Sequence, residues 1–151
     1  VYMRLEKLAD LRGRLLGLVG ADAEAFGPLA EAYRMPKDTP EQLEAKQAAI
    51  QDALVGATEV PLDIMRTAAA CVEHADFLAR NGSRMARSDA GVSVAFARAA
   101  VDGASLNVYI NAASIDDAER AARYRDEADR LVAQMREHCD EVFAFVKDAV
   151  S

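Results

Sequence analysis

Several kinds of residue are scarce in this sequence. Its 151 residues include no tryptophan, two cysteines, two histidines and four prolines. Cys71 and Cys139 are too few for a disulfide framework, and we expect both to be reduced thiols. No apolar run approaches the roughly 20 residues of a membrane span, and no signal peptide is evident. These absences argue against a disulfide-rich secreted domain and predict a cytoplasmic location with no membrane partner.

Basic charge is also scarce. Lys and Arg total 18 against 25 Asp and Glu, which gives a formal net charge of −7. Nucleic-acid binding draws most of its affinity from clustered basic side chains, so this balance argues against a nucleic-acid partner. Cys71 with His74, and His138 with Cys139, are pairs without further ligands nearby, so we predict no metal site. The chain also lacks a glycine-rich phosphate loop and a nucleophile elbow.

Alanine and helical periodicity, by contrast, are abundant. Over residues 2–34, apolar side chains recur every three or four positions, which predicts an amphipathic helix. Thr39 opens a capping-box pattern with a proline at the first helical position, and this predicts the start of a second helix. We expect Pro61 to divide the segment that follows into two helical runs, the second of which ends at Asn81-Gly82.

Two more helices are expected in the second half of the chain. Ser88 is predicted to cap a helix over residues 89–113, which carries few charges and should be central and buried. Ser114 is predicted to start a highly charged helix that runs to Val150. The sequence therefore predicts an all-α fold, an elongated bundle of about five helices, as a single domain over residues 1–151. A helix of ~33 residues is ~50 Å long, and burying the flanks of so long a bundle against a second copy predicts a homodimer.

Asp22 is the first candidate for chemistry. It lies among alanines and shortly before Pro28, which has no amide to complete the helical hydrogen bonds around it. One interpretation is a solvated carboxylate on a polar helix face. The other is a carboxylate with open space beside it, placed to move protons. Lys37, in the turn before the second helix, is either a solvated loop lysine or a local positive charge for an anionic ligand.

Polar side chains in the third quarter of the chain form a second group of candidates. Asn107 and Asn111 are four residues apart and so share one helix face. They belong either to a satisfied core network, such as one at a subunit interface, or to a surface that recognises the donor and acceptor edge of a ligand. Ser88 and Asp89 are either an N-cap and a first-turn acid or further ligand contacts.

Five motifs, taken together, carry a family resemblance. They are LVGADAEAF at 18–26, MPKDTP at 35–40, VPL at 60–62, SDAGV at 88–92 and NVYIN at 107–111. In this order and near this spacing they resemble the cyclodeaminase/cyclohydrolase family of folate one-carbon enzymes, and most of all its single-domain bacterial members. The resemblance covers the chain from about Leu11 to the C-terminus. That family normally begins with a further helix and a glycine-rich loop, so we expect the sequence to be N-terminally incomplete.

The resemblance implies roles for the candidate residues. Asp22 matches the catalytic acid/base of the family's Asp-Ala-Glu-Ala-Phe run. The implied substrate-binding residues are Arg34 and Lys37 at the glutamate tail of folate, with Ser88, Asp89, Asn107 and Asn111 near the pterin. A homodimer is implied as well. The substrate would be a reduced folate, with no cofactor and no metal.

The implied function is hydrolysis of 5,10-methenyltetrahydrofolate to 10-formyltetrahydrofolate by acid/base catalysis. Residues 106–111 and Asp116-Asp117 look most like the single-domain methenyltetrahydrofolate cyclohydrolases. One alternative is a formimidoyltetrahydrofolate cyclodeaminase, which releases ammonia through the same kind of tetrahedral carbon. The other is a catalytically inactive folate-binding or assembly subunit in a larger complex, which the missing N-terminal elements would favour.

Overall fold

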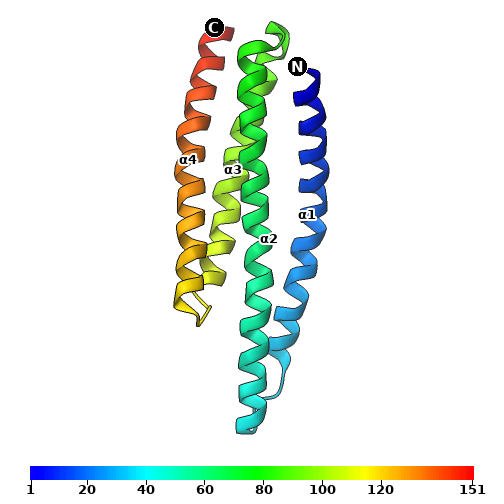
Figure 1. The fold of residues 1–151 in the computed structure, drawn as a ribbon, viewed down its shortest axis with the longest axis vertical. Coiled ribbons are helices and arrows are strands. Elements are labelled where there is room, and N and C mark those ends of the chain that lie inside the picture. The colour runs from blue at the N-terminus through cyan, green and yellow to red at the C-terminus, as the bar shows by residue number, and fades with distance from the viewer.

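Four long helices make up almost the whole chain. The structure, a computed structural model, describes all residues from 1 to 151. The helices α1 (Tyr2–Arg34), α2 (Pro40–Asn81), α3 (Arg87–Ala112) and α4 (Ala118–Val150) run alternately down and up an elongated bundle (Figure 1). None of them combines the length and the apolar character needed to cross a bilayer. The predicted all-α bundle is confirmed.

The hydrophobic core follows the seam between α2, α3 and α4. Helix α2 packs against each of the other three helices, whereas α1 packs mainly against α2. The largest fully buried side chains come from α2, α3 and α4, among them Leu54, Leu62, Met65, Val72, Val94, Val101, Val108 and Val142. Helix α1 contributes few buried side chains to this core. The groove between α1 and α3 is therefore left open over α2.

The predicted division at Pro61 is wrong, so the bundle has four long helices where about five were expected. Helix α2 continues for 42 residues through Pro61. A proline inside a helix costs about 3 kcal/mol. Leu62, directly after it, and Met65, one turn later, are fully buried, and burying each such side chain contributes about 1.5–3 kcal/mol. Tertiary packing thus outweighs the local penalty and keeps the helix continuous.

One predicted helix cap is confirmed and two are wrong. The Thr39 side chain accepts a hydrogen bond from the amide of Gln42 and completes the capping box. Helix α3 begins at Arg87, after a short 3-10 helix, so Ser88 lies inside its first turn and caps nothing. The cap of α4 is Asp117, whose carboxylate accepts from the amide of Arg120 at 3.0 Å, and not Ser114.

The loop before α4 shows why the cap prediction failed. The side chain of Gln51 on α2 donates to the carbonyl of Ser114 at 3.0 Å and accepts from the amide of Asp116 at 2.8 Å. Both contacts are with the backbone, and together they hold the loop in a shape that brings Asp117 to the helix start. Serine and aspartate are comparable caps, so a contact from a distant helix made the choice.

Helix α3 is buried on one side only, which corrects the expectation of a central, buried helix. The opposite side of α3 leaves large apolar residues exposed, and the neighbouring side of α1 also exposes large apolar residues. We call this surface the α1–α3 face. Its members are Leu16, Val19 and Phe26 of α1 and Val92, Phe96, Leu106 and Ile110 of α3, all of them more than half exposed.

A bidentate ion pair joins α2 to α4. Arg66 donates from Nε and Nη2 to the two carboxylate oxygens of Glu127, at 2.7 and 2.8 Å. Arg66 also reaches Glu59 and Asp63 on its own helix. The hydrogen bond from Arg66 holds the pKa of Glu127 below its usual range, against the opposing effect of burial. This cluster links α4 to α2 beside the hydrophobic core.

Candidate functional site

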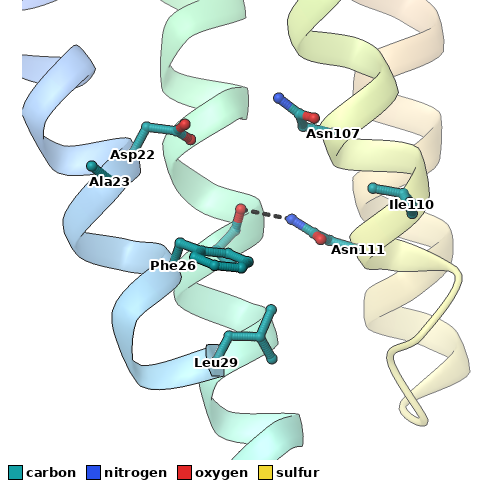
Figure 2. Close-up of a pocket in the computed structure, with 8 residues that line it drawn as sticks. Asp22, Ala23, Phe26, Leu29, Asn107, Ile110 and Asn111 are labelled. Atoms are coloured by element: carbon teal, nitrogen blue, oxygen red, sulfur yellow. Dashed lines mark hydrogen bonds between the residues drawn. The ribbon is translucent and has the colours of Figure 1, made fainter. Parts of the chain in front are cut away.

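A cavity of about 550 Å³ opens between α1 and α3, with α2 as its floor. This volume lies within the range of small-molecule sites. Its walls are apolar and carry three polar side chains. The lining residues are Asp22, Ala23, Phe26 and Leu29 of α1, Ala57 of α2, and Asn107, Ile110 and Asn111 of α3 (Figure 2).

Three of the predicted site residues meet in this cavity. Figure 2 shows Asp22 reaching from α1 toward Asn107 on α3, with Asn111 one turn further along the same helix. The Asp22 carboxylate is exposed and forms neither a hydrogen bond nor an ion pair with any other residue of the chain. A carboxylate left unpaired beside an apolar wall is available to a cationic ligand and to protons on that ligand.

The position of Asp22 follows from where α1 touches its neighbour. Leu18 and Leu29, which are buried, anchor α1 on α2. Four residues separate Leu18 from Asp22, which places the carboxylate about one turn further along nearly the same face. Phe26, one turn beyond Asp22, is exposed and forms the outer wall of the cavity. Asp22 thus lies at the boundary between the buried side of α1 and the α1–α3 face.

The two asparagines differ in their surroundings. The side-chain amide of Asn111 donates from Nδ2 to the carbonyl oxygen of Ala57 at 2.8 Å, across 54 positions of sequence (Figure 2). The side chain of Asn107 is exposed and forms no hydrogen bond with any other group of the chain. The interpretation as a satisfied network therefore fits only the Nδ2 end of Asn111. The side chain of Asn107 has no partner within the chain and is available to a ligand or to a second subunit.

Arg34 and Lys37 do not line the cavity. Arg34 is the last residue of α1, about 18 Å along the helix from Asp22 and about 120° around its axis. Lys37 follows in the loop between α1 and α2. Both side chains are exposed and take part in no ion pair. In a single chain they could meet only the far end of a ligand that extends along α1 beyond the cavity.

Ser88 and Asp89 are also distant from the cavity. They lie in the first turn of α3, and 19 residues of helix, about 28 Å, separate Ser88 from Asn107. Asp89 lines a second, smaller cavity of about 360 Å³, where the first turns of α1 approach the end of α2 and the start of α3. One chain by itself does not bring the two halves of the predicted site together.

Sequence reasoning missed the apolar walls and the floor of the cavity. Phe26 and Ile110 look like ordinary members of helical stripes, since nothing in the sequence shows which stripe stays exposed. The carbonyl of Ala57 could have been found, because Pro61 lies four residues later and removes its helical partner. Tyr109, between the two asparagines, points away from the cavity and donates to Asp129 of α4 at 2.6 Å.

The cysteines do not contribute a nucleophile to this site. Both are free thiols, and neither lines the cavity. Burial raises the pKa of Cys71, and it also raises the pKa of Cys139. A raised pKa leaves the thiolate sparsely populated at neutral pH. The chemistry this cavity offers is proton transfer by Asp22 together with hydrogen bonding by the asparagines.

Comparison with known proteins identifies relatives that match most of this chain. A family model described as formiminotransferase-cyclodeaminase matches residues 2–130. The methenyltetrahydrofolate cyclohydrolase of Methylorubrum extorquens is 38% identical over 147 residues, which are 97% of this chain and 71% of that protein. The formimidoyltransferase-cyclodeaminase of Sus scrofa is 35% identical over 123 residues, which are 82% of this chain and 23% of that protein.

A solved structure shares the fold. The crystal structure of formiminotetrahydrofolate cyclodeaminase from Thermotoga maritima superposes with a TM-score of 0.69 at 23% identity, over 93% of this chain and 64% of that one. The chain therefore spans less than two thirds of that structure and about a quarter of the Sus scrofa protein. The match over residues 2–130 and the 38% identity to the cyclohydrolase show that this chain belongs to the formiminotransferase-cyclodeaminase family.

Proposed function

We propose that the protein hydrolyses 5,10-methenyltetrahydrofolate to 10-formyltetrahydrofolate, with Asp22 as the acid/base. The observation that carries this proposal is the unpaired Asp22 carboxylate, which faces Asn107 across the cavity within the segment that matches the family. The 38% identity to a methenyltetrahydrofolate cyclohydrolase supports the reaction. The cavity volume of about 550 Å³ suits the pterin end of such a substrate.

The reaction needs one group that can accept and return a proton. The substrate is a cationic amidinium that bridges N5 and N10, and a fixed carboxylate beside it favours its binding. Water adds to the bridging carbon and gives one proton to Asp22, which forms a tetrahedral carbinol. The carbinol then loses its one remaining hydroxyl proton to solvent and the bond between its carbon and N5 breaks, while protonated Asp22 delivers its proton to N5. The balance is one water consumed and one proton released, with no cofactor required.

A cyclodeaminase is the second candidate. Its support is the shared fold with formiminotetrahydrofolate cyclodeaminase and the 35% identity to a formimidoyltransferase-cyclodeaminase. In that reaction N10 attacks the formimino carbon and ammonia leaves, so the same carboxylate would serve a tetrahedral carbon between two nitrogens. Ammonia release from 5-formimidoyltetrahydrofolate, measured beside methenyltetrahydrofolate hydrolysis, separates the two activities. Tight folate binding without either activity would support the third reading, an inactive folate-binding or assembly subunit.

We also propose a homodimer that buries the α1–α3 face. On α3 the large residues Val92, Phe96, Leu106 and Ile110 form one exposed stripe, with the small Gly103 within it. A Cβ added at Gly103 would meet nothing within 4 Å, so two backbones can approach closely there. Stripes of this kind are self-complementary about a two-fold axis.

Such a dimer accounts for the remote half of the predicted site. If the two copies of α3 pair antiparallel about the midpoint of the stripe, the start of one helix lies at the level of the end of the other. Ser88 and Asp89 of the partner subunit then lie within about one helical turn of the level of Asn111, measured along the helix axis. Arg34 and Lys37 remain proposed contacts for the glutamate tail of a bound folate. The free thiols Cys71 and Cys139 fit the proposed cytoplasmic location.

The test of the function is Asp22→Asn, which keeps the shape of the side chain and removes its charge and its proton. Loss of a positioned acid/base costs about 10²–10⁴-fold in rate. Turnover of methenyltetrahydrofolate, followed by its absorbance, should fall by that factor while the helical circular dichroism is unchanged. Glu24→Gln is the matched control, because Glu24 lies about 200° around α1 from Asp22 and does not line the cavity. Equal activity of Asp22→Asn and the parent would refute the role of Asp22.

A further inference from the structure

Pro61 exposes a backbone acceptor at the floor of the cavity. In an α-helix the amide four residues later donates to each carbonyl, and proline has no amide hydrogen. Pro61 lies inside α2, so the carbonyl of Ala57 has no helical donor. Ala57 and Pro61 are both buried, which makes an unpaired carbonyl costly at this place.

Asn111 supplies the missing donor from another helix. Its Nδ2 lies 2.8 Å from the carbonyl oxygen of Ala57. Only the amino end of a carboxamide can donate to a carbonyl, so this contact decides which end of Asn111 faces α2. The other end, Oδ1, receives no hydrogen bond from the chain, and Asn111 lines the cavity (Figure 2). The carboxamide is therefore oriented with its acceptor free for a ligand.

The other proline inside a helix, Pro28, shows that a carbonyl freed by a proline does not always receive a hydrogen bond from a side chain. Pro28 removes the helical donor from the carbonyl of Glu24 in α1 in the same way. No side chain donates to that carbonyl, and Glu24 is exposed, so water can serve it. The two prolines thus make the same local change, and only the one at the cavity floor is linked to a polar side chain of the cavity.

We propose that Pro61 is a positioning residue: it holds the Asn111 carboxamide by way of the Ala57 carbonyl, so that Asn111 Oδ1 accepts a hydrogen bond from an N–H of the bound ligand. This inference rests on the proposed function, in which the ligand is a reduced folate. A pterin ring carries N–H and amino donors along one edge. Asn111 Oδ1 on α3 then presents an acceptor to such an edge, while Asp22 on the opposite wall of the cavity stays available to the bridging carbon and N5.

The test is Pro61→Ala, which returns an amide to position 61. That amide donates to Ala57, competes with Asn111 Nδ2 and leaves the carboxamide free to rotate. Loss of one oriented hydrogen bond should raise KM for methenyltetrahydrofolate about 2- to 12-fold, while kcat stays within about 2-fold because Asp22 is untouched. The thermal midpoint should stay the same or rise, because a helix-interior proline is removed. Weaker binding in a protein of equal or greater stability is the combination that a merely structural proline does not produce.

Two further variants make the test specific. Pro28→Ala is the matched control, since it makes the same exchange next to a carbonyl that no side chain reaches, and its KM should equal that of the parent. In an Asn111→Leu background, Pro61→Ala should raise KM no further, because the residue through which it acts is gone. If Asn111→Leu is unstable alone, the double variant should recover stability, because the new amide satisfies the Ala57 carbonyl.

The outcomes separate this inference from the proposed function. An active parent whose KM is the same in Pro61→Ala, or additive effects of Pro61→Ala and Asn111→Leu, would overturn the positioning role and leave the proposed function intact. A parent that neither turns over nor binds reduced folates would overturn both. Hydrogen exchange of the Asn111 side-chain amide, measured by NMR without ligand, gives an independent readout. It should be slow in the parent and faster in Pro61→Ala, and equal rates would contradict the link between the two residues.

Discussion

Replacing Phe96 with alanine should weaken self-association of the protein. The ring lies in the middle part of α3 on the α1–α3 face and is 73% exposed in the single chain. A phenylalanine this exposed contributes little to the packing of its own chain. In a two-fold dimer across this face, both copies of the ring would be covered at once.

The size of the effect follows from the area at stake. Full burial of a phenylalanine side chain contributes about 1.5–3 kcal/mol. Because the ring is still about three-quarters exposed in the isolated chain, about three quarters of this burial free energy can be gained on dimerisation. A two-fold dimer contains two copies of Phe96, so Phe96→Ala should reduce the free energy of dimerisation by about 2–4 kcal/mol. At 1.4 kcal/mol for each factor of ten, the dissociation constant should rise about 30- to 700-fold.

Sedimentation velocity over a dilution series measures this change directly. Phe143→Ala on α4 is the control, because Phe143 is also about half exposed (51%) but lies off the α1–α3 face. The control should sediment like the parent, and both variants should keep the helical circular dichroism of the parent. Identical dissociation constants for Phe96→Ala and the parent, or a weaker dimer in Phe143→Ala alone, would refute the assignment of this face as the dimer interface.

Three further predictions concern stability. Gly17→Ala should raise the thermal midpoint by about 2–4 °C, since its Cβ meets nothing within 4 Å and a helical alanine is favoured by about 1 kcal/mol. Gly91→Ala should bring no gain or a loss, because its Cβ would lie 2.8 Å from Val146 Cγ1 and overpacking costs about 1–3 kcal/mol; a gain equal to that of Gly17→Ala would contradict the close approach of α3 and α4. Arg66 lowers the pKa of Glu127 in the folded protein, so this pair stabilises the fold above the unfolded pKa of Glu127 and loses that contribution as the pH falls through the lowered one. The difference in thermal midpoint between the parent and Arg66→Met should therefore shrink as the pH falls from above the unfolded pKa of Glu127 to below the lowered one, and a constant difference would refute the linkage.

Local signals in the sequence were enough for most of the helix boundaries. The apolar period predicted α1 over the residues it occupies, and the capping box at Thr39 and the glycine at Gly82 mark the two ends of α2. These signals act within one turn of helix, so no distant contact is needed to interpret them. The start of α3 was wrong because a short 3-10 helix, capped by Ser83, leads directly into α3 without a side-chain cap of its own. The start of α4 was wrong because Ser114 and Asp117 can cap equally well, and the backbone contacts of Gln51 decided between them.

The sequence by itself determined the helical class, the family and the three polar residues that meet in the cavity, because motifs and periodicity are properties of neighbours along the chain. Only the tertiary structure decided that α2 continues through Pro61, that the freed Ala57 carbonyl is taken by Asn111, and that Arg34, Lys37, Ser88 and Asp89 lie away from Asp22. Each of these outcomes depends on which helix faces lie opposite one another. That choice is set by burial summed over the whole bundle, which is why no local stretch of sequence contains it.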